Sequence, residues 1–227
     1  MRRKFLTAAI AAMGLLGLGF ASTPVLAQAR TLKISHQFPG GSIDEGDFRD
    51  RMVRRFAAEV EKQTKGALKF EIYPSGSLVK PVEQWGAMAN GSLDMSLYPL
   101  AYAGGRVPEL NIGLMPALVT SYEQGLRWKD APIGKELTRI VEEKGVKIIT
   151  WVWQAGGIAS RAKPVISPDD VKGLKFRGGS KEMDVMLKAA GASPTNVPSS
   201  EIYSAMQSGV LDAALTSSTS LISFRLH

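Results

Sequence analysis

The feature that most constrains this chain is a regular alternation of strand-like and helix-like segments along almost its whole length. Period-two alternation of apolar and polar residues predicts strands, and apolar residues three or four positions apart predict helices. The predicted strands are residues 31–36, 68–73, 93–97, 146–151, 158–161, 174–177 and 210–215. The predicted helices are residues 48–60, 78–88, 122–128, 134–144, 181–190 and 199–209. Such alternation favours an α/β fold with a mostly parallel sheet.

A second constraint is the change of character near residue 150, where helix-rich sequence gives way to shorter elements around Pro and Gly. We expect two lobes joined by crossing strands, with a cleft between them of the kind in which small ligands usually bind. Lobe I is expected over residues 28–150 and an incomplete lobe II over 151–211. Residues 212–227 are expected to form a crossing strand that returns toward lobe I before the chain ends.

Residues 1–27 have the pattern of an export signal. Basic residues at positions 2–4 precede an uncharged run over 5–20, and small residues favour cleavage after Ala27 or Ala29. The run is shorter than the roughly 20 apolar residues that a membrane span needs. Because the paired arginines also fit the twin-arginine pattern, both the Sec and the twin-arginine route stay open. We therefore expect a periplasmic protein.

The composition excludes several kinds of chemistry. The chain has no cysteine, so disulfides and thiolate sites are excluded. The two histidines, His36 and His227, are too few for a His-rich metal site, and we expect neither a metal nor a cofactor. Residues 1–27 hold three of the 28 basic and none of the 21 acidic residues, which leaves a net charge of +4. The remaining charges are interleaved, which argues against nucleic-acid binding.

Among side chains that could bind a ligand, Arg177 is the strongest candidate. It ends a predicted strand, and Gly178 and Gly179 follow it before the next helix. Ligands of α/β proteins bind at the carboxyl ends of strands, and a guanidinium holds a carboxylate through two parallel hydrogen bonds. From the residues alone, an exposed structural ion pair is the alternative. The sequence has no nucleophile elbow, P-loop or zinc-protease motif, so we expect no catalysis.

Several segments resemble, in the same order, segments of the extracytoplasmic solute-binding subunit of TRAP transporters, the DctP type. They are residues 59–66, 73–78, 90–95, 166–177, 191–194 and 200–212, and the resemblance spans residues 31–225. In that family the arginine of a Gly-Leu-Lys-x-Arg run holds the substrate carboxylate. The run is Gly-Leu-Lys-Phe-Arg in this sequence, so the resemblance assigns this role to Arg177.

The resemblance also implies a fold and a function. The implied fold is a two-lobed periplasmic solute-binding fold, with a ligand cleft between lobes that close on a small organic acid. The loaded protein, expected to be a monomer without enzymatic activity, would deliver the acid to a TRAP-type membrane permease. Family chains continue past the point where this chain stops, so the resemblance implies a C-terminally truncated member. A periplasmic sensory subunit and an enzyme that processes organic acids are the alternatives.

The remaining expected ligand contacts lie near the ends of predicted strands, where side chains can reach a cleft. They are His36, Tyr98, Trp153, Gln154 and Thr216. We expect one ring of the pair Trp151 and Trp153 to face the cleft and the other to face the core. Thr216 matches the family's amide contact by position. The chain lacks the second arginine and the Asn-Pro pair of sialate-type members, so the expected ligand is another organic acid.

Overall fold

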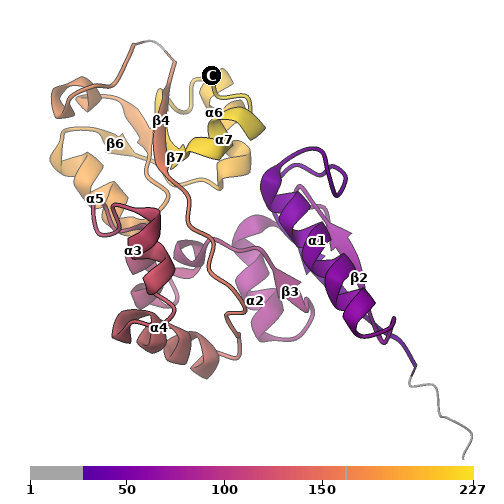
Figure 1. Cartoon of the computed structure of the whole chain (residues 1–227). Helices are drawn as coiled ribbons and strands as arrows, with labels where there is room; N and C mark the ends of the chain where they lie inside the picture. Colours follow the sequence, from indigo (N-terminus) through magenta and orange to yellow (C-terminus); the bar gives the residue numbers. More distant parts are fainter. Residues whose placement is uncertain (1–27, 162) are drawn as a thin grey trace, which may run out of the picture.

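The structure is a computed structural model that describes residues 28–161 and 163–227, so the expected export signal at 1–27 lies outside the described residues. Within them the strands form two separate sheets (Figure 1). The first sheet has the order β2-β1-β3 and the second has the order β4-β7-β5-β6. Four of the five strand pairings are parallel, and β4 with β7 is antiparallel. The predicted two-lobed α/β class with mostly parallel sheets is therefore confirmed.

The first lobe is built around β1, which lies between β2 and β3. Its strands are β1 (Arg30–Ser35), β2 (Leu68–Tyr73) and β3 (Met95–Ser96). Its α-helices are α1 (Phe48–Gln63), α2 (Gln84–Ala89), α3 (Tyr122–Arg127) and α4 (Pro132–Glu143). Three 3-10 helices accompany them, η1 (Pro81–Glu83), η2 (Leu100–Ala103) and η3 (Pro108–Leu114). The helix α1 begins after Asp47, whose carboxylate accepts the Arg49 N–H as an N-cap.

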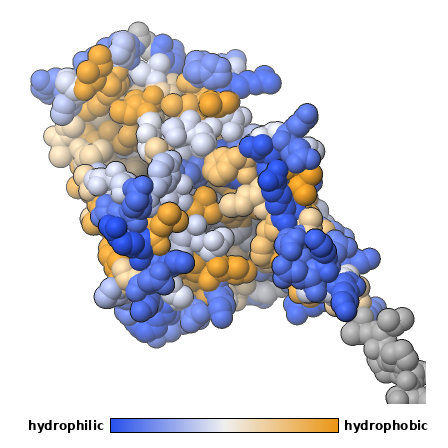
Figure 2. All heavy atoms as spheres, viewed as in Figure 1, coloured by the Kyte–Doolittle hydropathy of each residue, from blue (hydrophilic) through white to orange (hydrophobic). Residues whose placement is uncertain are grey.

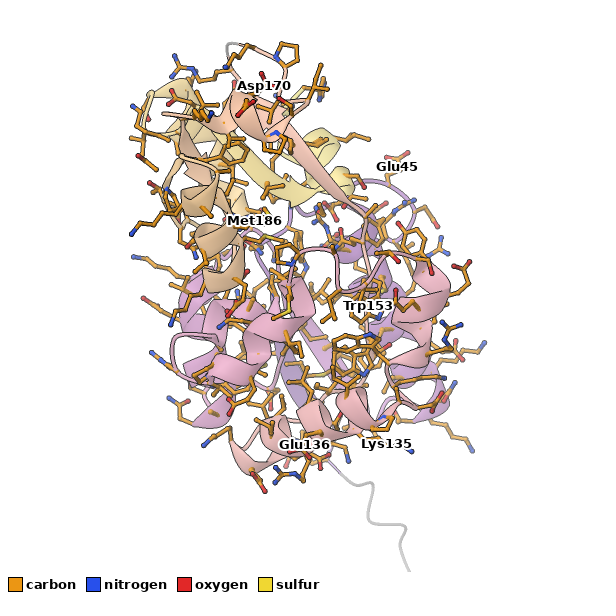
Figure 3. The ribbon with its side chains drawn as sticks, turned by 90° about the vertical axis from the view of Figure 1, so that its left-hand side faces the viewer. Glu45, Lys135, Glu136, Trp153, Asp170 and Met186 are labelled. Atoms are coloured by element: carbon orange, nitrogen blue, oxygen red, sulfur yellow. The ribbon has the colours of Figure 1, made fainter. Side chains whose placement is uncertain are left out.

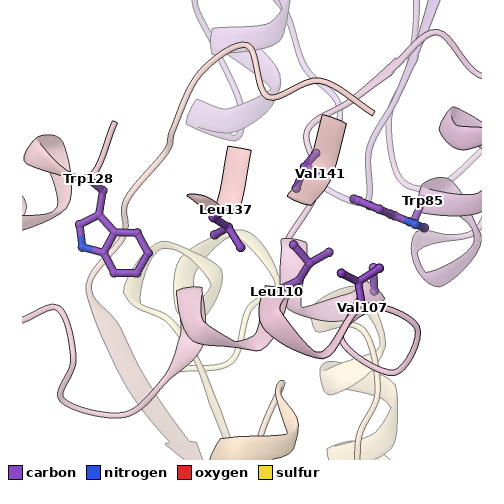
Figure 4. Close-up of a cluster of buried hydrophobic side chains, with 7 residues drawn as sticks. Trp85, Val107, Leu110, Trp128, Leu137 and Val141 are labelled. Carbon is purple, nitrogen blue, oxygen red and sulfur yellow. The ribbon is translucent and has the colours of Figure 1, made fainter. Parts of the chain in front are cut away.

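A hydrophobic cluster fills the first lobe between α4, η3 and the loop segments around them (Figure 4). The side chains of Leu110, Leu137 and Val141 are buried in it. Leu137 and Val141 are four residues apart, so one face of α4 presents both of them to the cluster. Trp85 and Trp128 lie at opposite sides of the cluster in Figure 4.

The second lobe places its sheet between two hydrophobic clusters. Its strands are β4 (Gly156–Ser160), β5 (Lys175–Arg177), β6 (Ser193–Pro194) and β7 (Ala213–Ser217). Its helices are η4 (Pro168–Val171), α5 (Lys181–Ala189), η5 (Ser199–Glu201), α6 (Ile202–Gln207) and α7 (Ser218–Ser223). Ala213 packs with Phe176 in one cluster and Ala214 with Ile202 in the other, since successive strand residues face opposite sides.

One expectation about the second half of the chain was wrong, and another stays a prediction. The expected strand at 146–151 is an irregular connection from α4 to β4 (Figure 1), because its apolar side chains pack on the first lobe's cluster and no described strand pairs with it. The strand β7 lies inside the second sheet, paired with β4 and β5, and it runs antiparallel to β4, the strand with which the chain enters this sheet. The end of β7 and the helix α7 both contact the first lobe, where Arg49 donates to Ser217 and to Ser220. The return of residues 212–227 toward lobe I therefore stays a prediction.

Other differences concern the lengths of elements. The helix expected over 78–88 begins at Pro81 as a 3-10 turn, and β3 has two residues where five were expected. Within residues 28–161 and 163–227, no helix combines the length and apolar character needed to cross a membrane. On the face that Figure 2 shows, apolar side chains lie in several separate groups among polar ones.

Candidate functional site

Two buried arginines lie where the two lobes meet. Arg49 is in the first turn of α1 in the first lobe, and Arg177 ends β5 in the second. Their exposed fractions are 1% and 4%. Hydrogen bonds from both guanidinium groups cross from one lobe to the other, to Ser220 and to Tyr102. The junction between the lobes is therefore the candidate site.

The three nitrogens of the Arg177 guanidinium all donate to neutral oxygens. Nε donates to the Val197 carbonyl at 2.9 Å, Nη1 to the Leu215 carbonyl at 2.7 Å, and Nη2 to the Tyr102 hydroxyl at 3.1 Å. The group lies against Gly179, which has a φ of +98°, and a Cβ on Gly179 would lie 2.7 Å from Nη1. Glycine at this position therefore provides both the turn and the room for the guanidinium.

Arg177 has no acidic partner in the described part of the chain. No carboxylate there lies within 4.0 Å of its nitrogens. At longer range Arg177 acts on Asp184: burial raises the pKa of Asp184, while Asn196 and Arg177 lower it. A buried cation with neutral acceptors alone is costly, because desolvation is not balanced by an opposite charge. The geometry therefore favours an anionic ligand at Arg177.

Tyr102 connects Arg177 to the first lobe and was not among the predicted site residues. Its hydroxyl oxygen accepts hydrogen bonds from the Ser199 N–H at 2.9 Å and from Gln37 Nε2 at 3.3 Å. These bonds join η2, the loop after β1 and the start of η5. Tyr102 lies four residues after Tyr98, which is a helical spacing, but none of the predicted helices includes it. That spacing was the one sequence signal for Tyr102.

Arg49 forms a second polar group at the junction. Its Nε and Nη2 donate to the two carboxylate oxygens of Asp47 at 2.9 and 2.6 Å. Its Nη1 donates to Ser220 Oγ at 3.0 Å, and its guanidinium carbon lies 3.8 Å from the centre of the Phe38 ring. Burial raises the pKa of Asp47, but hydrogen bonds from Arg49 and Ser223 outweigh it and the net shift is downward. Because Asp47 neutralises Arg49, this group links the lobes without attracting a further anion.

Gln154 and Thr216, two expected ligand contacts, lie in different parts of the junction. Gln154 Oε1 accepts a hydrogen bond from Arg49 Nη1 at 3.5 Å, which places Gln154 in the Arg49 group. Thr216 lies in β7 directly after Leu215, whose carbonyl accepts from Arg177. The structure therefore brings Gln154 to Arg49, and the backbone beside Thr216 to Arg177.

His36 is completely buried in the first lobe, with an exposed fraction of 0%. Its Nε2 lies 3.1 Å from Asp50 Oδ1, and Asp50 Oδ2 also accepts from Arg54 and from the Gly41 N–H. Its Nδ1 has no partner among the described residues. His36 thus pairs with Asp50 inside the first lobe, and its expected ligand contact stays a prediction.

We predict that this histidine makes the protein less stable in mild acid. Burial lowers the pKa of His36 below its ordinary value of 6.5, although Asp50 and Asp47 act in the opposite direction. The unfolded chain therefore binds a proton that the folded chain excludes, and stability falls as the pH drops below about 6.5 toward the folded pKa. When the pH is lowered from about 7.5 to about 5, the melting temperature of the wild type should fall further than that of His36→Gln. Parallel decreases in the two proteins would contradict this.

The expectation that Trp151 and Trp153 face opposite sides was wrong. Residues two apart in an extended segment point to the same side, and the two rings stack 6.2 Å apart at 11°. Trp153 also lies 5.1 Å from Trp128 and packs against Gly125, and Figure 3 shows it in the interior. Its Nε1 is buried without a partner among the described residues. Trp153 therefore packs, partly buried, against the hydrophobic cluster of the first lobe, and its expected ligand contact stays a prediction.

Tyr98 lies next to the site but outside its hydrogen bonds. Its ring is 6.1 Å from the Tyr102 ring in an edge-on arrangement and 6.2 Å from Trp85. Its hydroxyl is buried without a partner in the described part of the chain, and burial raises the pKa of Tyr98. Tyr98 therefore supports the ring of Tyr102, and Tyr102 provides the polar contact.

A cavity of about 270 Å³ lies beside the Arg177–Tyr102 pair. Its lining comes from both lobes and includes Ala101, Tyr102, Asn111, Lys181, Asp184, Asn196 and Val197. Ligand pockets are commonly about 300–1,000 Å³, so this one is of a size for a small ligand. Nowhere in residues 28–161 and 163–227 do three or more His, Asp or Glu side chains gather as metal ligands.

Two α/β lobes that meet around a buried cation, which has no acidic partner among the described residues, are typical of a two-lobed solute-binding protein. The chain belongs to the DctP family, bacterial extracellular solute-binding protein family 7, which matches residues 42–227. This confirms the resemblance found in the sequence. The family is one of solute-binding proteins, in agreement with the expectation that the protein is not an enzyme.

Individual relatives agree with this assignment. A solute-binding protein of Albidiferax ferrireducens is 64% identical over 214 residues, covering 93% of this chain and 63% of that protein. The crystal structure of a TRAP periplasmic solute-binding protein from Rhodoferax ferrireducens with bound malonate has a TM-score of 0.85 at 67% identity, covering 86% of this chain and 62% of that one. The C4-dicarboxylate-binding periplasmic protein DctP of Rhodobacter capsulatus is 31% identical over 84% of this chain and 56% of that protein. This chain thus spans about three fifths of the length of these relatives.

Proposed function

We propose that the protein binds a small organic acid in the periplasm, holds one carboxylate with Arg177, and delivers the acid to the membrane subunits of a TRAP-type permease. The observation that carries the proposal is the buried guanidinium of Arg177, which has neutral acceptors alone within the described residues. The malonate-bound relative at 67% identity supports a small dicarboxylate as the ligand. The cavity beside Arg177 supports the same size class.

The same geometry supports closure of the lobes on the ligand. Hydrogen bonds from Arg177 to Tyr102 and from Arg49 to Ser220 join the lobes in this conformation. A ligand that touches both lobes favours the closed form over an open one, because a ligand shifts such an equilibrium only through its different affinity for the two forms. Closure also excludes water, which strengthens the attraction between the guanidinium and the carboxylate.

Malonate binding to the 227-residue chain is the test of this function. Malonate should raise the melting temperature in proportion to the logarithm of its concentration, with a stabilisation of about 2.7 kcal/mol at 100 times the dissociation constant. Malonamide has the same shape without the negative charges and should leave the melting temperature unchanged. Malonate should be recovered unaltered after incubation. The proposal fails if neither malonate nor any other organic acid of two to six carbons raises the melting temperature.

A further inference from the structure

The hydroxyl oxygen of Tyr102 has more donors around it than a neutral phenol can use. The Ser199 N–H lies 2.9 Å away, Arg177 Nη2 3.1 Å and Gln37 Nε2 3.3 Å. A phenol oxygen accepts two hydrogen bonds, and its own proton needs an acceptor, for which Ser199 Oγ lies at 3.2 Å and Gln37 Oε1 at 3.5 Å. Three donors therefore converge on an oxygen that can satisfy two of them.

A carboxylate oxygen fits this set of donors better than a phenol does. It is ionised, carries no proton that needs an acceptor, and shares about four lone-pair sites with the second oxygen of its group. Hydrogen bonds between ionised groups are roughly twice as strong as neutral ones. When a carboxylate oxygen replaces the phenol oxygen, the hydrogen bond from Arg177 is therefore strengthened most. The other two donors, a backbone N–H and an amide, are also groups that bind carboxylate oxygens.

We propose that the Tyr102 hydroxyl is a built-in stand-in for one carboxylate oxygen of the ligand, and that the ligand displaces it on binding. The inference rests on the proposed function and adds to it a defined subsite, formed by Arg177, the Ser199 N–H and the Gln37 amide. Tyr102 lies on the four-residue helix η2, which Gly104 follows, and it lines the 270 Å³ cavity. The cavity therefore provides a space next to the Tyr102 ring into which the ring can move.

The stand-in has opposite effects on the free and the loaded protein. In the free protein the phenol gives the buried guanidinium a third acceptor and so stabilises the fold. During binding the phenol competes with the ligand, because the subsite is available only in the fraction of molecules in which the phenol has left. Removal of the hydroxyl should therefore destabilise the free protein and strengthen ligand binding.

Tyr102→Phe tests this, because it removes the hydroxyl and keeps the ring. Calorimetric titration with malonate should give a dissociation constant roughly 3- to 10-fold lower than that of the wild type. The melting temperature of the free variant should fall by about 2–5 °C. Tyr98→Phe is the matched control for stability, since the Tyr98 hydroxyl has no partner among the described residues, and it should not lower the melting temperature.

Two results would overturn the inference in distinguishable ways. Unchanged or weaker malonate binding by Tyr102→Phe overturns the stand-in and leaves the proposed function intact, because the wild type still binds. If neither the wild type nor Tyr102→Phe binds malonate at millimolar concentration or any of the other acids, the proposed function fails and the stand-in fails with it.

Discussion

Replacing Arg177 with alanine is expected to weaken malonate binding by roughly 30-fold to several thousand-fold. Truncating one member of a buried, hydrogen-bonded charge pair costs about 2–5 kcal/mol, and each 1.4 kcal/mol is a tenfold change in affinity. Much of this cost is the penalty of burying the ligand's carboxylate without a cation. Arg49, the other buried arginine of the junction, cannot replace Arg177 because Asp47 already neutralises it. Calorimetric titration of the variant with malonate measures the loss.

Two further variants make this result specific. Arg177→Lys keeps the positive charge but loses the planar fork, so it should also bind malonate at least tenfold more weakly. Arg55→Ala removes an exposed arginine that pairs with Asp44 on the surface, and its affinity should equal that of the wild type. Circular dichroism and melting curves show whether each variant is folded. If Arg177→Lys and Arg177→Ala are both folded and both bind malonate as tightly as the wild type, Arg177 is not part of the binding site.

The position of Arg177 could be predicted from the sequence because the signals for it are local. A strand end, two glycines and a following helix are all within a few residues of it. Those signals place a side chain at the carboxyl edge of a sheet, where ligands bind. The alternation of strands and helices likewise fixes the α/β class, because each element reflects the period of its own residues.

The rest of the site depends on how the lobes meet, which local patterns do not contain. Tyr102 is 75 residues from Arg177, and Arg49 is 171 residues from Ser220. The same limit explains why the sequence did not predict the surroundings of His36 and Trp153. His36 ends a predicted strand and Trp153 follows one, and such positions often lead to a cleft. In the structure, however, His36 is buried and Trp153 packs against the first lobe's hydrophobic cluster.

The second large effect is expected for Asp47→Ala, which should lower the free energy of unfolding by about 3–5 kcal/mol. The substitution leaves Arg49 buried without its negative partner, and breaking a buried pair in this way costs about that much. It also removes the N-cap of α1. For a chain of this length the melting temperature should fall by roughly 6–20 °C. Urea unfolding and thermal melting measure the two quantities.

The reason for the effect is the uncompensated charge, and a second substitution can test it. The double variant Asp47→Ala, Arg49→Met removes both charges, so it should be more stable than Asp47→Ala alone, because a buried pair replaced by apolar groups is often close to neutral. Asp44→Ala is the matched control: Asp44 also pairs with an arginine, but both side chains are exposed, at 76% and 63%, so its removal should not shift the melting temperature measurably. Equal instability of the single and double variants would show that the cap and the packing of Arg49, rather than its charge, hold α1 and the second lobe together.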